Sequence, residues 1–356
     1  MMLRVRVAWA LVFLLAGWIG AVPVLAVPYS TCVPGIAGGP STGDGTHAYV
    51  FASHTCTPGS LVQDAMSVSA GWTQTCALLD LGNVDCWGSD TPSTGQDHVG
   101  LDVVQVTAGW YHACALLGSG DVDCWPNEPA GDVEDYGGGD AVAVAAGGFF
   151  TCMLRTAGDV VCNGHDSEGQ AAGRTAADAV RLSVGGRHAC VVTTTGGVAC
   201  WGSDEYGQDA DYAGTDAVAV SAGYHTTCVL RVDDTVHCWG FIPSGAAADD
   251  LEGDVVQVAV GASYWCLLRE GGDVDCVGSD GNTGRTAGHA GGDAIAVSAG
   301  LRHACALLDS GTIDCWGYDY GGQSSDYPTP LQATLPGAEL CVDGPCVGAQ
   351  PRTLAS

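Results

Sequence analysis

Cysteine pairs with a fixed internal spacing recur along the chain, and they restrict the possible folds more than any other feature of the sequence. The two cysteines of a pair are ten residues apart, and successive pairs follow at 38 residues, or at 39 for the last step. The pairs are Cys76 and Cys86, Cys114 and Cys124, Cys152 and Cys162, Cys190 and Cys200, Cys228 and Cys238, Cys266 and Cys276, and Cys305 and Cys315. A constant period of this length is typical of repeat proteins, in which each copy forms one supersecondary unit. We therefore expect seven equivalent units within residues 64–330.

Each copy carries the signals of short β-strands joined by tight turns. Alternating segments such as DAVAVSAG (216–223) predict a first strand, and segments such as HACALL (303–308) and TIDCWG (312–317) predict a hairpin. A polar loop then leads to a weaker fourth strand. Four strands of about five residues with short turns fill such a repeat. The chain is therefore predicted to be an all-β, seven-bladed β-propeller of four-stranded antiparallel blades.

The two cysteines of a pair are placed to form a disulfide within their own hairpin. Cys305 and Cys315 each lie five residues from Ser310, the centre of a glycine-containing turn. Residues equidistant from a turn face each other across an antiparallel hairpin, close enough for a disulfide. A zinc site is the competing interpretation, but this spacing without a neighbouring C-x-x-C is a poor zinc signature. We predict one intrahairpin disulfide per blade, and neither a metal site nor a cofactor.

The N-terminus has the features of a secretory signal peptide over residues 1–26. Two arginines precede an apolar run that ends at the small-residue sequence Val24-Leu25-Ala26. An uncleaved anchor is the alternative, because the run is nearly long enough to span a bilayer. Pro23 and the alanine at the junction favour cleavage. We expect a secreted or periplasmic chain, free of the membrane after processing, in a compartment where disulfides form.

Two segments lie outside the repeats. Residues 27–63 contain HAYVFASHTC (47–56), which predicts an extra strand that caps or completes a terminal blade. Residues 331–356 contain CVDGPC (341–346), which predicts a small turn between two cysteines. Cys32, Cys56, Cys341 and Cys346 allow three pairings, and the sequence does not choose among them. We favour Cys32–Cys56 and Cys341–Cys346.

The composition is strongly acidic. The chain has 11 basic residues, none of them lysine, against 40 acidic residues, and a formal net charge of −29. Phosphate binding needs neutralising cations, so we expect no nucleic-acid partner and no attraction to anionic membranes. A solvated acidic surface is the default interpretation and identifies no partner. We expect a monomer.

Several phrases of the repeat resemble a known family. AGWYHACALL (108–117), SAGLRHACALL (298–308), DCWGSD (85–90) and YGQ (206–208) are similar to the repeats of the regulator-of-chromosome-condensation family. The short repeat is most similar to that of the bacterial β-lactamase inhibitory propellers. The resemblance implies a propeller that binds a protein through its aromatic loop positions. The cysteine pair is not a general family feature. The nuclear members' nucleotide exchange and chromatin binding are not expected of an exported, acidic chain.

Antiparallel topology divides the loops of every repeat between two faces. We call the three residues after the glycine that ends the first strand the first loop, and the residues after the third strand the second loop. Both loops should lie on one face of the propeller, which we call the loop face. The hairpin turns and the Asp-initiated connections should form the opposite turn face. The first loops read WTQ (72–74), WYH (110–112), GFF (148–150), GRH (186–188), YHT (224–226), ASY (262–264) and LRH (301–303).

Large aromatic residues with acidic neighbours on these loops are typical of a protein-binding surface with a few anchor residues. The candidate contacts from the first loops are Trp72, Trp110, Tyr111, Phe149, Phe150, Tyr224, His225, Tyr264 and Arg302. Those from the second loops are Asp204, Glu205, Tyr206, Asp319 and Tyr320, with Asp90, Phe241 and Asp280 beside them. The alternative is that some of these rings fold inward and pack between blades.

Three other repeated residue types have structural interpretations. The histidines at the third first-loop position are spread around the ring, which favours structural hydrogen bonding over metal binding; they are His112, His188 and His303. The tryptophans after the second cysteine are expected in the inter-blade core; they are Trp87, Trp125, Trp201, Trp239 and Trp316. The aspartates that open each repeat are interpreted as caps of local backbone amides; they are Asp64, Asp102, Asp140, Asp178, Asp216, Asp254 and Asp293. The sequence leaves open whether that ring binds cations.

The sequence favours a binding module over an enzyme. It contains no Gly-x-Ser-x-Gly elbow, phosphate loop or metal motif, and its densest polar departure from the repeat, residues 165–168, is interpreted as a solvated loop. We expect a secreted, non-catalytic propeller that recognises a protein ligand through the loop face. The alternative is a lectin or an enzyme acting on extracellular polysaccharide, which as a glycosidase would need two carboxylates from neighbouring loops about 5–10 Å apart. A structural cell-surface protein is the third possibility.

Overall fold

The computed structural model describes residues 64–326, except for residues 81, 89–101, 127–132 and 244–252. All described residues belong to one compact unit, Gly59–Ala338. The predicted signal peptide (1–26), the predicted N-terminal cap (27–63) and the C-terminal extension (331–356) lie outside the described residues, as do the pairs Cys32–Cys56 and Cys341–Cys346. These remain predictions.

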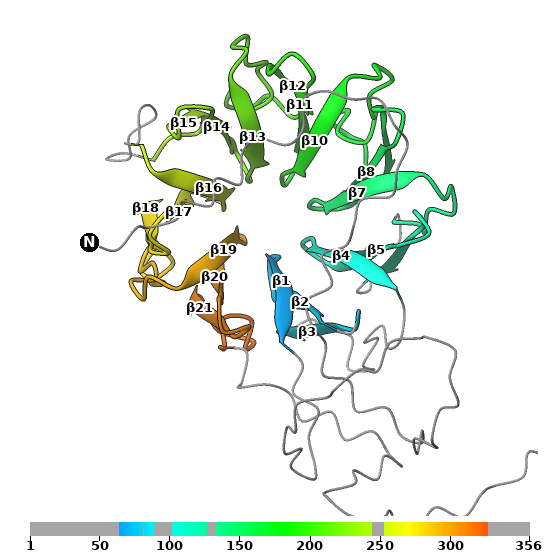
Figure 1. The fold of residues 1–356 in the computed structure, drawn as a ribbon. Helices are drawn as coiled ribbons and strands as arrows, with labels where there is room; N and C mark the ends of the chain where they lie inside the picture. The colour runs from blue at the N-terminus through cyan, green and yellow to red at the C-terminus, as the bar shows by residue number, and fades with distance from the viewer. Residues whose placement is uncertain (1–63, 81, 89–101, 127–132, 244–252, 327–356) are drawn as a thin grey trace, which may run out of the picture. The chain divides into compact units, whose positions relative to one another are not determined.

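Seven antiparallel sheets, each of three consecutive strands, are arranged around a common centre (Figure 1). The first strands, nearest the centre, are β1 (Ala65–Ala70), β4 (Val103–Ala108), β7 (Ala141–Ala146), β10 (Ala179–Val184), β13 (Ala217–Ala222), β16 (Val255–Val260) and β19 (Ala294–Ala299). The second strands are β2 (Gln74–Leu79), β5 (His112–Leu117), β8 (Phe150–Arg155), β11 (His188–Thr193), β14 (Thr226–Arg231), β17 (Tyr264–Arg269) and β20 (His303–Leu308). The third strands are β3 (Val84–Gly88), β6 (Val122–Pro126), β9 (Val160–Gly164), β12 (Val198–Gly202), β15 (Val236–Gly240), β18 (Val274–Gly278) and β21 (Ile313–Gly317). The predicted all-β propeller of seven repeats is confirmed.

The fourth strand of the blade is shorter than the sequence predicts. In four repeats it is a single antiparallel bridge to the third strand; the bridges are Val122–Tyr136, Val160–Arg174, Val198–Tyr212 and Val274–His289. The corresponding positions of the other three repeats lie outside the described residues. The segment is polar and rich in glycine, as in YGGGD (136–140), so it lacks the apolar alternation that extends a ladder.

The hydrophobic core is divided into seven clusters, each built from two consecutive repeats. The second strands supply most of it, because their short apolar runs are covered on both sides. The repeated tryptophans take part as predicted, and Trp125, for example, is buried against Cys76 and Leu78 of the preceding repeat. One cluster joins Leu307 of the last repeat to Leu79 of the first. The core therefore runs around the whole ring.

All seven predicted intrahairpin disulfides are present, with Cα–Cα separations of 4.0 or 4.1 Å. The two cysteines of each pair face each other in the hairpin register, as the turn-centre argument predicts. The bonds join Cys76 to Cys86, Cys114 to Cys124, Cys152 to Cys162, Cys190 to Cys200, Cys228 to Cys238, Cys266 to Cys276, and Cys305 to Cys315.

The two cysteines of a disulfide differ in burial. The first lies on the second strand, within the core, and is fully buried in every repeat. The second lies on the third strand, and it is buried in two repeats, at Cys238 and Cys315. In the other five repeats it is only partly buried; these residues are Cys86, Cys124, Cys162, Cys200 and Cys276. Each disulfide thus ties the outer strand to the core strand, and in the chain-entropy view each such short loop stabilises the fold by roughly 2–3 kcal/mol.

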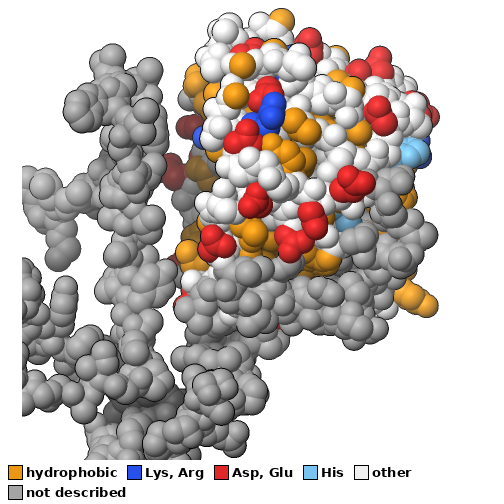
Figure 2. Space-filling model, turned by 90° about the vertical axis from the view of Figure 1, so that its right-hand side faces the viewer, with side chains coloured by type: hydrophobic (Ala, Val, Ile, Leu, Met, Phe, Trp, Pro, Cys, Tyr) orange, Lys and Arg blue, Asp and Glu red, His pale blue; other side chains and the backbone are white. Residues whose placement is uncertain are grey.

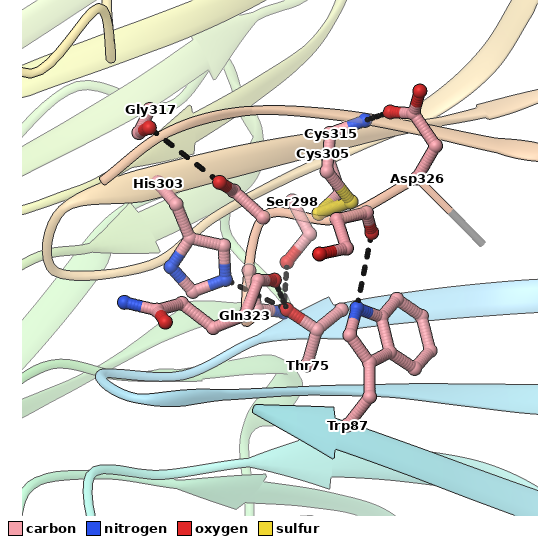
Figure 3. The surroundings of a disulfide bond; sticks show 12 residues. Thr75, Trp87, Ser298, His303, Cys305, Cys315, Gly317, Gln323 and Asp326 are labelled. Atoms are coloured by element: carbon pink, nitrogen blue, oxygen red, sulfur yellow. Dashed lines mark hydrogen bonds between the residues drawn. A yellow bond between two sulfur atoms is a disulfide. The ribbon is translucent and has the colours of Figure 1, made fainter. Parts of the chain in front are cut away.

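Polar contacts close the ring between the last and first repeats (Figure 3). The Thr75 hydroxyl lies 2.7 Å from Nε2 of His303 and donates to the Gln323 carbonyl at 2.8 Å. The Trp87 indole donates to Ser325, and the Ala70 amide donates to the Ser298 hydroxyl. Equivalent bonds join earlier repeats, as between Ser69 and Ala108. The junction that closes the ring is thus built like the others.

The aspartate that opens each repeat contributes differently from the predicted capping. Its main-chain carbonyl accepts a hydrogen bond from the residue that follows the second strand, as Asp140 does from Thr156 at 2.9 Å. In four repeats its side chain binds the residue four positions earlier, which is the fourth-strand bridge residue; the pairs are Tyr136–Asp140, Arg174–Asp178, Tyr212–Asp216 and His289–Asp293. In these four repeats the aspartate side chain therefore fastens the edge of the blade.

Candidate ligand-binding face

Hydrogen bonds place the loops on two faces, as predicted. The first and second loops of one repeat are joined, for example by the Phe241 amide, which donates to the His225 carbonyl at 2.8 Å, and by the Tyr318 amide, which donates to Arg302 at 3.0 Å. At the opposite end, the starts of six first strands bind the hairpin turn of the preceding repeat, as Ala141 binds Gly120 at 3.1 Å. The first and second loops therefore lie together at one end of the blades, and the hairpin turns lie at the other end.

The third residue of every first loop is buried, which corrects two of the predicted ligand contacts. Phe150 is 0% exposed and Tyr264 is 1% exposed, so neither reaches a ligand on the loop face. The other third-position residues, Gln74, His112, His188, Thr226 and His303, are at most 2% exposed. Each of the seven lies two residues before the first cysteine of its repeat, and a strand returns to the same side every second residue. The third position therefore faces the core together with the cysteine.

We name these seven buried side chains the buried ring, and five of them form hydrogen bonds with the next repeat. His112 lies 2.8 Å from the Thr151 hydroxyl, His188 lies 2.8 Å from Thr227, and His303 closes the circle at Thr75. The Gln74 amide donates to the His112 carbonyl, and the Tyr264 hydroxyl donates to the His303 carbonyl. The predicted structural role of the histidines is confirmed, because each binds the next blade.

Eight side chains on the loop face form a continuous aromatic cluster: Trp72, Trp110, Tyr111, Phe149, Tyr224, His225, Tyr206 and Phe241. Trp72, Trp110, Tyr111 and Phe149 contact one another with ring centroids 5.0–5.6 Å apart, mostly edge to face. Tyr224, His225, Tyr206 and Phe241 form a second group with centroids 3.9–5.4 Å apart. Such pairs are each worth about 0.5–1.5 kcal/mol beyond their burial, so the cluster is a preorganised surface.

Trp110 of the second repeat joins the two groups by contacting Tyr224 of the fifth repeat at 5.2 Å. The contact spans repeats three and four, whose first loops begin with Gly148 and Gly186. A Cβ atom at Gly186 would lie 2.5 Å from the Tyr224 ring and 2.9 Å from the Trp110 ring. A Cβ atom at Gly148 would lie 3.3 Å from Trp110. The two glycines therefore make room for rings from other repeats, a role that the pattern within one repeat does not predict.

The remaining candidate residues lie at the edge of this surface. Asp204, Glu205, Arg302 and Asp319 are exposed, and Tyr320 is 86% exposed. Burial and a hydrogen bond with Asp204 raise the pKa of Asp209 to about 6. Burial lowers the pKa of His225. Asp90 lies outside the described residues.

Two cavities open on the loop face. The first is the mouth of the central channel, surrounded by the ends of the first strands of all seven repeats and by Trp110, Tyr224 and Leu301. The second lies beside Tyr206, Tyr224 and Phe241, with Arg285 and Arg302. Neither cavity is lined by an Asp or Glu among the described residues. The two carboxylates of a glycosidase pocket are therefore not found in either.

Acidic side chains are scattered over the side of the propeller in Figure 2, with a small basic area among them. Within the described part of the chain, no three His, Cys, Asp or Glu side chains gather as a metal site would require. In the same part, no helix long and apolar enough to cross a membrane is found.

The model described as "Regulator of chromosome condensation (RCC1) repeat" matches residues 103–125, 141–170, 179–208, 217–241 and 294–323. The chain is a propeller of RCC1-type repeats. Three matched segments reach the glutamine of the second loop. In this RCC1 propeller, the side chains of Gln170, Gln208 and Gln323 are buried and fold their own loops by accepting a backbone amide hydrogen bond.

Solved structures share the architecture of this RCC1 propeller. The CRINKLY WD40 ectodomain of the Arabidopsis thaliana receptor kinase ACR4 is 21% identical, with a TM-score of 0.64, over 76% of this chain and 100% of that one. The ectodomain of the Physcomitrella patens receptor kinase CR4 is 22% identical, with a TM-score of 0.58, over 73% and 75% of the chains. Human WBSCR16 is 16% identical, with a TM-score of 0.59, over 73% and 88%. At these identities the likeness establishes the fold alone. A search of curated proteins found no match.

Proposed function

We propose that this RCC1 propeller is a secreted, monomeric, non-catalytic binding module that recognises a protein ligand through the aromatic cluster. The observation that carries the proposal is the contiguity of the cluster: eight rings from the first five repeats contact one another on one face. Preformed aromatic surfaces of this kind supply the anchor residues of protein interfaces.

Two further observations support an extracellular binding role. Seven disulfides need an oxidising compartment to form and persist. Two solved propellers of the same architecture are ectodomains of receptor kinases. A disulfide in every blade makes the propeller rigid, and a rigid binding surface is preorganised for its ligand.

The test removes the ring at the centre of the cluster. Trp110→Ala and wild-type protein are immobilised and exposed to the extracellular fraction of the native host, and captured proteins are quantified by mass spectrometry. The control is Ile295→Ala, because Ile295 is 58% exposed near the turn-face end of β19. We expect Trp110→Ala to lose an anchor worth about 2 kcal/mol, about thirtyfold in affinity, while Ile295→Ala captures the same protein as the wild type. Equal capture by wild type and Trp110→Ala would show that the chosen surface is wrong.

A further inference from the structure

A pocket on the loop face combines aromatic rings with two of the chain's few positive charges. Residues of the four consecutive repeats from the fourth to the seventh line it. Its walls include Tyr206, Tyr224, His225, Phe241, Arg285 and Arg302. Phe241 and Tyr206 are 40% and 43% exposed, so the apolar wall is open to solvent. The chain has only 11 basic residues against 40 acidic ones, so two arginines in one pocket are a local reversal of its charge.

Three other arginines of the propeller, Arg155, Arg174 and Arg269, are paired with carboxylates. Arg174 bonds Asp178 at 3.0 Å, and Arg269 bonds Asp254 at 2.8 Å, both at the aspartates that open the repeats. In the described part of the chain, neither Arg285 nor Arg302 has an Asp or Glu oxygen within 4.0 Å. Instead, each guanidinium carbon lies 5.5 Å from an aromatic centroid, Arg285 over Tyr264 and Arg302 over Tyr318.

Two carboxylates of the second loops in the sixth and seventh repeats accept hydrogen bonds within their own loops. Asp280 accepts hydrogen bonds from the amide and the hydroxyl of Thr286 at 3.4 and 3.3 Å. Asp319 accepts one from the Ser324 amide at 3.0 Å. Burial lowers the pKa of Arg285; the charges of Tyr264 and Asp280 oppose that shift, and the charge of Arg302 adds to it. An anion bound between the two guanidinium groups would act in the same sense as Asp280.

We propose that this pocket binds the carboxylate of an Asp or Glu side chain of the protein ligand, while an apolar or aromatic residue beside it packs on Tyr224 and Phe241. The inference rests on the proposed function, since it names the chemistry of the partner. Guanidinium donors match a carboxylate in two parallel hydrogen bonds. Stacking on Tyr264 and Tyr318 orients the two groups, and because the Nε–H of Arg285 donates to the Ser279 carbonyl, its terminal amino groups are the donors that would bind the carboxylate. The acidic surface elsewhere repels such a ligand, so the pocket also fixes where it docks.

The arrangement of the rings favours a protein segment over an acidic polysaccharide. Tyr206 meets Phe241 at 74° and His225 at 59°. The rings therefore present edges and faces in different directions, which suits a folded side chain. A sugar chain would instead stack on ring faces aligned along a groove. The polysaccharide is kept as one outcome of the test.

The test uses two matched probes on the full mature chain, the blocked dipeptides N-acetyl-Phe-Glu-amide and N-acetyl-Phe-Gln-amide. Binding is followed by the NMR signals of the arginine Nε–H groups, which are few because the chain has so few basic residues. We expect the Glu probe to bind about tenfold more tightly than the Gln probe, as charge-assisted hydrogen bonds imply, and to shift the Arg285 and Arg302 signals. Trigalacturonate is titrated in parallel.

Charge-matched variants separate the pocket from the general electrostatics. Arg302→Gln should reduce affinity for the Glu probe about tenfold, to that of the Gln probe, and Arg285→Gln should act in the same direction. Arg181→Gln is the control, because Arg181 is exposed on β10 and has no carboxylate partner among the described residues. Equal affinity of the two probes, no binding of either, an equal effect of Arg181→Gln, or tighter binding of trigalacturonate would overturn the inference.

The same variants distinguish this inference from the proposed function. If Trp110→Ala loses the captured host protein and Arg302→Gln retains it at full strength, the aromatic cluster binds the ligand and the carboxylate pocket is wrong. If both variants retain it, the binding face itself is wrong. Loss in both, with retention in Arg181→Gln, supports the two proposals together.

Discussion

Two regions of the propeller are adjacent in sequence and opposite in use. The third residue of each first loop belongs to the buried ring, where His112, His188 and His303 bind the following blade. The first and second residues of the same loops supply the aromatic cluster on the surface. One step along the chain thus separates a residue that holds blades together from a residue that is free to contact a ligand.

The difference teaches that residue type alone does not assign a role in this fold. Phe149 and Phe150 are the same side chain, yet one is 36% exposed and the other is 0% exposed. The alternation of the strand decides between them. Stability should therefore respond to changes in the buried ring, and binding should respond to changes in the cluster. Three predictions test that separation.

The largest effect is expected from acid. Burial lowers the pKa of His112 and His303 to about 4 and that of His188 to about 3, from a value of 6.5. The unfolded chain therefore binds more protons than the folded one between these values, and the free energy of unfolding should fall as the pH drops from 6.5 towards 4. Each histidine contributes roughly 3 kcal/mol to that fall. Urea unfolding across this pH range measures it.

The control for the acid prediction is a triple variant in which the three histidines become glutamine, the residue found natively at position 74. It should lose most of the pH dependence between 6.5 and 4. His289 remains in this variant and acts in the opposite sense. Although burial opposes the shift, its hydrogen bonds with Asp293 and Asp314 raise its pKa, so its contribution is lost as the pH rises. An unchanged pH dependence in the triple variant would contradict the role of the buried ring.

A smaller effect is expected from one member of the ring. His303→Ala removes the group that binds Thr75 across the closing junction and leaves a cavity (Figure 3). We expect a loss of about 3 kcal/mol in the free energy of unfolding, measured by urea denaturation. His303→Gln keeps a polar group at the site and should cost less. Ligand capture per folded molecule should stay at the wild-type level. Weakened capture in a fully folded sample would show that ring and cluster are not separate.

The sequence predicts the repeated parts of the molecule well, because each is specified within one repeat. The spacing of Cys305 and Cys315 about Ser310 predicts the hairpin, its register and its disulfide. Alternation could also have identified Phe150 and Tyr264 as buried, since each lies two residues before a buried cysteine. Reading the loop by its aromatic content instead placed both on the surface.

Contacts between distant repeats could not be predicted in this way. Trp110 meets Tyr224 only because the ring closes and brings the second and fifth repeats to the same channel mouth. Arg285 and Arg302 share a pocket although they come from the consecutive sixth and seventh repeats, and no periodic signal marks their pairing. Asp280 and Asp319 accept hydrogen bonds within their own loops and form no ion pair with the two arginines. The geometry of these loops determines that arrangement. Sequence periodicity predicts the structure of one blade, whereas the candidate site is formed by loops of several blades.

The smallest effect on stability, with a clear effect on binding, is expected at a glycine. In Gly186→Ala the new methyl group would meet the rings of Tyr224 and Trp110 at 2.5 and 2.9 Å, both of which are side chains that can turn aside. We expect a loss of stability below about 1 kcal/mol, separation of the two groups of the cluster, and a loss of ligand affinity of about tenfold. Chemical shifts of the Trp110 indole report the displacement, and capture reports the binding. Gly271→Ala is the matched control, since a Cβ atom there has nothing within 4 Å. If Gly186→Ala moves the indole signal and still captures the ligand as the wild type does, the bridge between the two groups is not part of the binding surface.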